Sequence, residues 1–208
     1  MADYTFYTNP MSRGQIARWA LHEAGAEYDQ MLVDWSRKPA ELLAANPMGK
    51  VPTIVHHATG GDYVISEAAA ICAYLADAHP LHELAPRDSE RADYYRWMFF
   101  AAGPVEAAVS AKSMGLLAPA DRAGLVGYGS FEQTVDTLEI AVQAASPWLL
   151  GDQFTAADVY VGSQVSWGLM FKTLPERPAF AEYAGRLRGR EAAQRAAALD
   201  DALIAKPE

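Results

Sequence analysis

Ser12 is the residue best placed to stabilise a small anion. It lies at the predicted N-terminus of a helix, where unpaired backbone N–H groups and the helix dipole favour negative charge. A serine in this place also commonly serves as a helix cap, and the two roles are compatible. A serine-histidine-aspartate triad is not indicated, because none of the five histidines lies in a recognisable nucleophile motif.

Two other stretches could recognise a small peptide-like ligand. In residues 46–52, NPMGKVP, Pro52 restricts Val51 to an extended backbone that could pair with the peptide groups of a ligand. In Ser66-Glu67-Ala68, which opens a later helix, backbone N–H groups could hold a carboxylate while Glu67 holds an ammonium group. Each stretch has a structural alternative, because proline before a strand often marks a turn and a first-turn Glu complements the helix dipole.

The histidines and the single cysteine do not indicate metal or disulfide chemistry. His56 and His57 are adjacent on a strand and point to opposite faces, and His79 and His82 have no acidic or cysteine partner at ligand spacing. We therefore expect no metal site. Cys72 cannot form an internal disulfide, and its alanine-rich helix predicts a buried thiol in the core.

Residues 1–78 predict strands that alternate with helices. The predicted strands are 4–8, 27–33, 51–55 and 63–65, and the predicted helices are 13–24, 39–45 and 67–78. Two prolines make 79–88 a linker. Beyond it, 89–102, 122–145, 155–169 and 178–203 predict helices. The fold class is α+β, with an N-terminal domain at 1–78 and an all-α domain at 89–208.

Composition narrows the class of protein. The 208 residues carry 17 Lys and Arg against 26 Asp and Glu, so the formal net charge is −9, which argues against nucleic acid as a partner. Hydrophobic residues form 51% of the chain, enough for a sizeable core. Apolar runs are too short to span a membrane and the N-terminus lacks a secretory signal, so we expect a cytoplasmic protein.

Three motifs together resemble the glutathione transferase family, over nearly the whole chain. Residues 46–52 are similar to the family's NPxGxVP segment with a cis-proline, and 66–71, SEAAAI, to its γ-glutamyl-binding motif. Thr155-Ala156-Ala157-Asp158 resembles its helical capping box, in which Thr155 and Asp158 bond reciprocally. The resemblance, to bacterial cytosolic, serine-type, theta-like members, implies a thioredoxin-like N-terminal domain followed by an all-α helical C-terminal domain.

The resemblance also implies how glutathione is held. The backbone of Val51, before the cis-Pro52, pairs with the cysteinyl part of glutathione, and Glu67 meets its amino group. Many members have Ser or Thr after the acidic residue, whereas this chain has Ala68, which offers only its backbone N–H and implies lower affinity. The cations expected at the glycine carboxylate are Arg37, Lys38 and Lys50.

Thiol activation is assigned to Ser12, with Tyr7 as the open alternative. Family members use Tyr, Ser or Cys near the end of the first strand or the start of the first helix, and this chain has no Cys there. A Ser12 hydroxyl would stabilise the thiolate together with the helix terminus and Arg13. Glutathione then acts as a co-substrate, and no cofactor is expected.

The second substrate is expected to be a small apolar electrophile. The family's arrangement places it between Met11 and the helix that carries Trp97 and Phe100, in a homodimeric detoxification enzyme. The electrophile and the reaction subtype are not readable from the sequence. Two rival interpretations are a glutathione-transferase-like binding protein without turnover and a thiol-disulfide oxidoreductase, although the latter lacks a CxxC pair.

Overall fold

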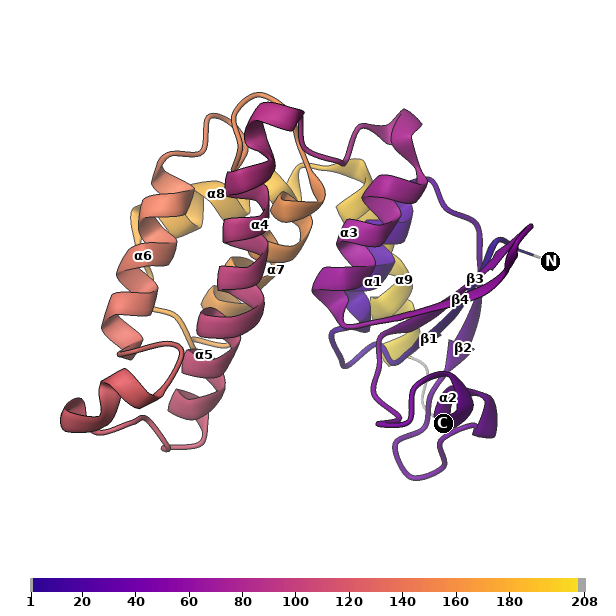
Figure 1. Ribbon diagram of the computed structural model, residues 1–208, viewed down its shortest axis with the longest axis horizontal. Helices are drawn as coiled ribbons and strands as arrows, with labels where there is room; N and C mark the ends of the chain where they lie inside the picture. Colours follow the sequence, from indigo (N-terminus) through magenta and orange to yellow (C-terminus); the bar gives the residue numbers. More distant parts are fainter. Residues whose placement is uncertain (1, 206–208) are drawn as a thin grey trace. The chain divides into compact units, whose positions relative to one another are not determined.

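The computed structural model describes residues 2–205, which divide into two compact units (Figure 1). The first unit combines Met1–Ala85 with Gly189–Glu208, and the second is Pro86–Arg188. Met1 and residues 206–208, which the predicted domain ranges include, lie outside the described residues.

The first unit is built on a four-stranded mixed sheet. Its strands are β1 (Tyr4–Thr8), β2 (Tyr28–Leu32), β3 (Thr53–Ala58) and β4 (Gly61–Ser66), in the order β2-β1-β3-β4. β1 and β2 are parallel, whereas β3 is antiparallel to both β1 and β4. Its helices are α1 (Gly14–Glu23), α2 (Ala40–Ala45), α3 (Ala68–Ala78) and α9 (Glu191–Ile204). The elements predicted within residues 1–78 are all present, and the domain is thioredoxin-like.

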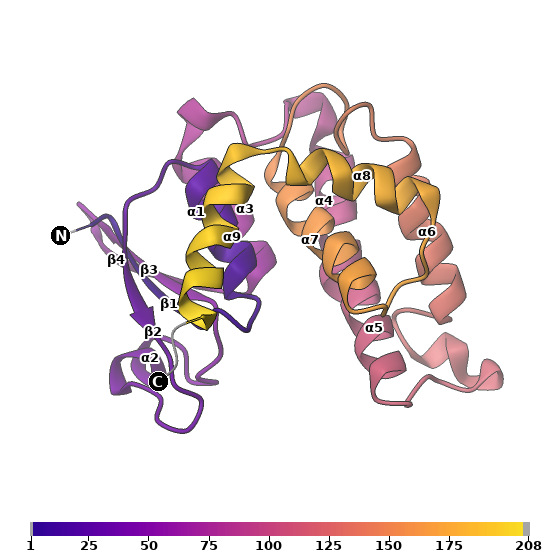
Figure 2. The same ribbon diagram turned by 180° about the vertical axis from the view of Figure 1, so that it is seen from behind.

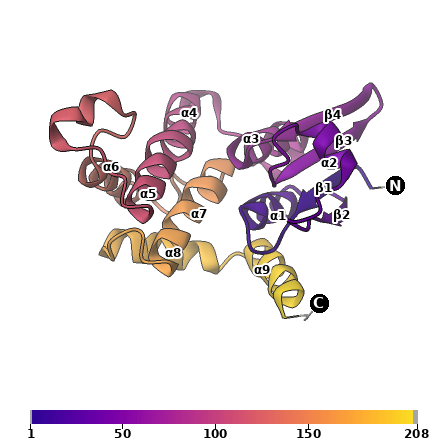
Figure 3. The same ribbon diagram turned by 90° about the horizontal axis from the view of Figure 1, so that it is seen from below.

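The alternation of side chains along β1 gives the sheet two different faces. Tyr4, Phe6 and Thr8 are fully buried on the face toward α1 and α3, which lie side by side (Figure 3). Tyr7 points to the other face, where it packs against Leu42 of α2. The strand that leads to Ser12 is therefore buried on both sides, which fixes the position of the loop that follows.

The last helix belongs to the first unit, although the sequence placed 89–208 in one domain. α9 lies beside α1 (Figure 2), and Arg190, directly before α9, forms two hydrogen bonds of 2.6 and 2.7 Å with the Glu23 carboxylate. The predicted helix 178–203 is interrupted at Gly189 and Arg190, where Arg190 has an extended backbone. An apolar helical pattern does not specify which core the helix covers, and here buried polar contacts to α1 decide it.

The second unit is helical throughout its regular structure. Its helices are α4 (Arg91–Phe100), α5 (Glu106–Ser113), α6 (Phe131–Gln143), α7 (Ala156–Met170) and α8 (Pro178–Arg188). A π-helical turn, Ala101–Val105, joins α4 to α5, and Pro104 lies inside it. The predicted helix 89–102 therefore continues into α5, because the wider turn accommodates a proline that has no N–H to donate.

The predicted helix 122–145 is wrong in its first third. A 3-10 helix, Ala120–Leu125, is followed by an irregular stretch, and α6 begins after Ser130, whose hydroxyl accepts from the Gln133 N–H at 3.1 Å. Gly129 has φ +62°, a conformation that suits glycine and that a continuous helix does not contain. The helix thus starts at a serine cap rather than at Arg122.

The capping box at the start of α7 is confirmed. The Thr155 N–H donates to Asp158 at 3.0 Å, and the reciprocal bond is present. The Leu149 N–H and the Tyr183 hydroxyl also donate to the Asp158 carboxylate, at 2.7 and 2.8 Å. Burial raises the pKa of Asp158, and these hydrogen bonds oppose that rise. Among residues 2–205, no helix is long and apolar enough to cross a membrane.

Candidate functional site

The three stretches with predicted chemistry meet at one end of the sheet. In the strand register Tyr7 lies opposite Thr53, and Thr53 lies opposite Ser66. The end of β1, the start of β3 and the end of β4 therefore lie at the same end of the sheet. Ser12 follows the first of these, Val51-Pro52 precedes the second and Glu67 follows the third, so the fold gathers them within one unit.

The Ser12 hydroxyl is half-buried and closes the turn that begins α1. It donates to the Asn9 carbonyl at 2.6 Å and accepts from the Gly14 N–H at 2.9 Å. The Ser12 side chain thus satisfies one backbone N–H at the start of α1, although the N-cap residue of this helix is Arg13. A ligand sulfur at this helix end would compete with the Asn9 carbonyl for the serine proton, while the Gly14 N–H would keep the oxygen in place.

Tyr7 lies in a different environment. Its ring is buried in a cluster with Val33, Leu42 and Val55. Burial raises the pKa of Tyr7, and the charge of Glu41 raises it further. A phenol with a raised pKa is a weaker proton donor toward a thiolate, so its surroundings favour Ser12 for that role.

The loop before β3 is held by side chains that the sequence analysis did not single out. The Val51-Pro52 peptide bond is cis, as the resemblance implied. The buried Asn46 amide donates to the Lys50 carbonyl at 3.3 Å and to the Thr53 hydroxyl at 3.1 Å. Asn46 therefore fixes the backbone that presents Val51. An asparagine at the start of a proline-containing turn was the available signal.

The predicted cations differ in their relation to this loop. Lys38 is half-buried, and its Nζ lies 3.2 Å from the point where a Cβ on Gly49 would stand. Arg37 and Lys50 are exposed. Arg37 contributes to lowering the pKa of Asp34, after the larger effect of hydrogen bonds from Ser36, so its charge lies near that carboxylate. The Lys38 ammonium therefore lies beside Gly49 of this loop.

Glu67 has a backbone conformation that is rare for its residue type. It precedes α3 with φ 69° and ψ 119°, and its side chain is exposed. Positive φ in a residue with a Cβ costs on the order of 1–3 kcal/mol and clusters at functional sites. Ala68, the first residue of α3, is buried, and the N–H groups of this first turn have no acceptor within the helix.

The predicted electrophile pocket divides between the two units. Met11, in the first unit, is 78% exposed. In the second unit Trp97 is buried and meets Phe100 edge-on, with ring centroids 5.9 Å apart, while the Arg96 guanidinium lies 4.3 Å from the Trp97 ring. A joint pocket formed by these residues stays a prediction.

Histidine and cysteine contacts are structural in character. His57 lies between Thr5 and Asp62, at 2.8 and 2.9 Å, and His79 bonds to the Tyr4 hydroxyl at 2.9 Å. Within the described part of the chain, no cluster of three His, Cys, Asp or Glu side chains could hold a metal ion. Cys72 is fully buried, and burial raises the pKa of its thiol to about 12.

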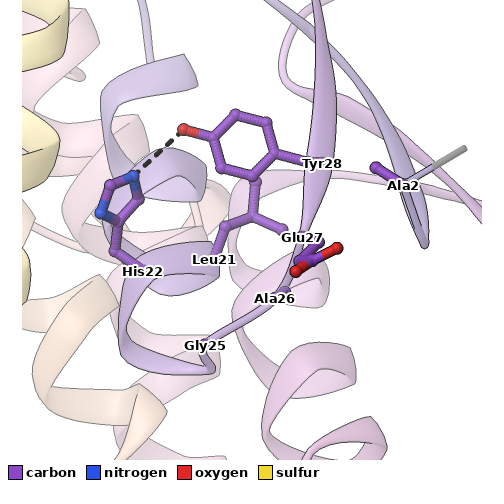
Figure 4. A pocket seen from close by; sticks show the side chains of 7 residues that line it. All are labelled: Ala2, Leu21, His22, Gly25, Ala26, Glu27 and Tyr28. Atoms are coloured by element: carbon purple, nitrogen blue, oxygen red, sulfur yellow. Dashed lines mark hydrogen bonds between the residues drawn. The ribbon is translucent and has the colours of Figure 1, made fainter.

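A surface pocket of about 460 Å³ lies at the opposite end of the sheet (Figure 4). Its lining includes Leu21, His22, Glu27 and Tyr28, and His22 bonds to the Tyr28 hydroxyl at 3.1 Å. Tyr28 is opposite Tyr4, at the start of β1, whereas Ser12 follows the end of β1. None of the predicted site residues lines this pocket.

The sheet order, the cis-proline loop and the helical second unit define a protein with a thioredoxin-like N-terminal domain followed by a helical domain. Residues 2–77 match the family model of the glutathione S-transferase N-terminal domain. Glutathione S-transferase 2 of Schizosaccharomyces pombe is 35% identical over 112 residues, which are 49% of this chain and 47% of that protein. The matched region thus spans about half the length of that relative.

Two solved structures match over nearly the whole chain. A glutathione transferase from Methylococcus capsulatus has 26% identity and a TM-score of 0.77, with coverage of 95% of this chain and 98% of that one. The bacterial glutathione S-transferase BphK has 27% identity and a TM-score of 0.74, with coverage of 95% and 99%. Residues 2–77 are therefore similar to the glutathione S-transferase N-terminal domain, and the chain as a whole is similar to these two solved glutathione transferases.

Proposed function

We propose that this chain is a glutathione transferase that activates the glutathione thiol for attack on a small apolar electrophile. The observation that carries the proposal is the convergence of Ser12, the cis Val51-Pro52 bond and Glu67 at one edge of the sheet. A helix N-terminus, an extended backbone and an acidic side chain are the three groups needed for a thiolate, a peptide group and an ammonium group.

Ser12 is the catalytic residue in this proposal. Its hydroxyl turns from the Asn9 carbonyl to the glutathione sulfur and donates to the thiolate, while the N-terminus of α1 and Arg13 add positive potential. A free thiol has a pKa of about 8.5, so lowering it by two units needs roughly 2.7 kcal/mol. One charge-assisted hydrogen bond together with a helix end is of this size. The thiol proton goes to solvent. With an aryl-halide acceptor, the thiolate then forms the carbon–sulfur bond as the carbon–halogen bond breaks, and the halide leaves with the electron pair of that bond.

The other groups of glutathione bind the residues that precede β3 and follow β4 at the same end of the sheet. The backbone of Val51, fixed beside the cis-Pro52, pairs with the cysteinyl unit. Glu67 holds the amino group, and the N–H of Ala68 holds the γ-glutamyl carboxylate. The glycine carboxylate meets Lys38 and Lys50, with Arg37 at the periphery. The placement of the Lys38 ammonium beside Gly49 supports this arrangement.

The proposal also covers the electrophile site, the oligomeric state and the cellular role. In the first unit Met11, which is 78% exposed, offers apolar surface for the acceptor. We expect a cytoplasmic homodimer with a role in detoxification.

Turnover of a general aryl-halide acceptor with glutathione tests the proposal. The parent protein is expected to form the conjugate, and Ser12→Ala to lose at least about tenfold in kcat, since it removes an interaction made to the developing thiolate. Tyr7→Phe is the matched control and is expected to retain activity. Retention of the parent on immobilised glutathione, without conjugation of any acceptor in a panel, would contradict the enzymatic proposal and favour a binding protein.

A further inference from the structure

Thr8, the last residue of β1, has a buried hydroxyl that no other residue in 2–205 partners. Thr8 is 0% exposed, and its Oγ1 makes no hydrogen bond to any of these residues. A buried hydroxyl that makes no hydrogen bond typically costs on the order of 1–3 kcal/mol, and such groups are rare in folded proteins. Valine has the same shape and carries no such cost. Threonine at this position therefore indicates that the hydroxyl has a function.

The Thr8 hydroxyl is aimed at the turn that holds Ser12. A Cβ built on Gly14 would stand 2.0 Å from Thr8 Oγ1 and 3.0 Å from Ser12 Oγ. Glycine at position 14 thus leaves the space into which both hydroxyls point. Thr8 approaches from the strand below the helix end, whereas Ser12 belongs to the turn itself.

The Ser12 oxygen has room for one further donor. A hydroxyl oxygen has two lone pairs and one proton. One lone pair accepts from the Gly14 N–H, and the proton is donated to the Asn9 carbonyl. When the proton turns to a ligand sulfur, the second lone pair can accept from the Thr8 hydroxyl, which has no hydrogen-bond partner among the described residues.

We propose that Thr8 is a positioning residue for thiol activation, which donates its hydroxyl proton to Ser12 Oγ when Ser12 donates to the glutathione thiolate. This inference rests on the proposed function. A donor that itself accepts a hydrogen bond is a stronger donor, because the bonds in a chain polarise one another. With Thr8, Ser12 Oγ makes three hydrogen bonds: it accepts from the Gly14 N–H and the Thr8 hydroxyl, and it donates to the sulfur.

The test compares Thr8→Val, Thr8→Ser and the control Thr5→Val, which removes a hydroxyl from the same strand on the opposite face, where it bonds to His57. The readouts are the pKa of bound glutathione, from thiolate absorbance against pH, and the free energy of unfolding. Thr8→Val is expected to raise the thiol pKa by about half a unit, roughly a threefold loss in thiolate at a pH below that pKa, without loss of stability. Thr8→Ser is expected to restore the parent pKa, and Thr5→Val to leave it unchanged.

A merely structural threonine gives a different pattern. If Thr8→Val leaves the thiol pKa at the parent value while Ser12→Ala raises it, the role of Thr8 is overturned and the proposed function stands. If the parent binds glutathione without lowering its thiol pKa, both proposals fail. If Thr8→Ser shifts the pKa as much as Thr8→Val, the effect comes from packing and the inference is wrong.

Discussion

Arg18 of α1 and Asp200 of α9 form a buried ion pair across 182 residues of sequence. The Arg18 Nε lies 2.9 Å from Asp200 Oδ1, and each side chain is 1% exposed. The Arg18 guanidinium also donates to the Tyr28 hydroxyl at 3.0 Å and lies 5.4 Å from the Phe6 ring. The pair therefore fixes the C-terminal helix on the first unit.

Removing one partner of this pair is expected to destabilise the first unit strongly. Asp200→Ala leaves a buried guanidinium without its counter-charge, so the free energy of unfolding should fall by about 3–5 kcal/mol. Urea denaturation monitored by circular dichroism measures it. The control is Glu191→Gln on the same helix, whose exposed bridge to Arg195 is worth less than about 1 kcal/mol. Equal effects of the two substitutions would contradict the assigned role of Asp200.

The backbone conformation of Glu67 is expected to lower the stability of the protein, while its carboxylate contributes to glutathione binding. Glu67→Gly relieves the positive φ and should raise the free energy of unfolding by about 1 kcal/mol. Glu67→Gln keeps the strain and should leave stability unchanged. Both substitutions remove the charge that faces the ligand ammonium, so each should weaken glutathione binding at least about tenfold, as measured by calorimetry. Unchanged affinity in both variants would remove Glu67 from the site.

Stability is expected to fall on mild acidification because of His79. Burial, followed by the charges of His82 and His56, lowers the pKa of His79 below its ordinary value of 6.5. The unfolded chain then binds the proton more readily than the folded chain does. The contribution is complete above pH 6.5 and is lost as pH falls through the lowered folded pKa. Thermal unfolding between pH 7.5 and 5 should show a shallower slope for His79→Gln than for the parent. Equal slopes would contradict the assignment.

Cys72 is expected to be unreactive in the folded protein. With a pKa of about 12, only about one part in ten thousand of the thiol is ionised at pH 8, and the side chain is fully buried. A chromogenic disulfide reagent should therefore titrate no thiol in the native protein and one thiol per chain in urea. Rapid native labelling would show that α3 opens more readily than its packing implies.

The loop before β3 and the start of α7 could be predicted from the sequence because local chemistry determines them. Pro52 and Gly49 specify the loop before β3, and Thr155 with Asp158 specifies the start of α7. Contacts between distant segments were not readable. The place of α9 depends on Asp200 finding Arg18, and the π-helical turn depends on how the fold accommodates Pro104.

The same limit applies inside the candidate site. Ser12 was predicted from its place at a helix start. The Thr8 hydroxyl lies near Ser12 because of the way α1 packs against β1, and no local sequence pattern encodes that packing. Asn46 belonged to a recognised motif, yet its bonds to Lys50 and Thr53 emerge only from the folded loop.

Thiol activation by Ser12 is tested most directly by the thiolate absorbance of bound glutathione as a function of pH, for the parent, Ser12→Ala and Tyr7→Phe. If Ser12 activates the thiol, the parent midpoint should lie about two units below the ordinary thiol value of about 8.5, return toward that value in Ser12→Ala, and stay unchanged in Tyr7→Phe. A midpoint that Ser12→Ala leaves in place and Tyr7→Phe raises would contradict activation by Ser12, and would move thiol activation from the start of α1 to the buried phenol of β1.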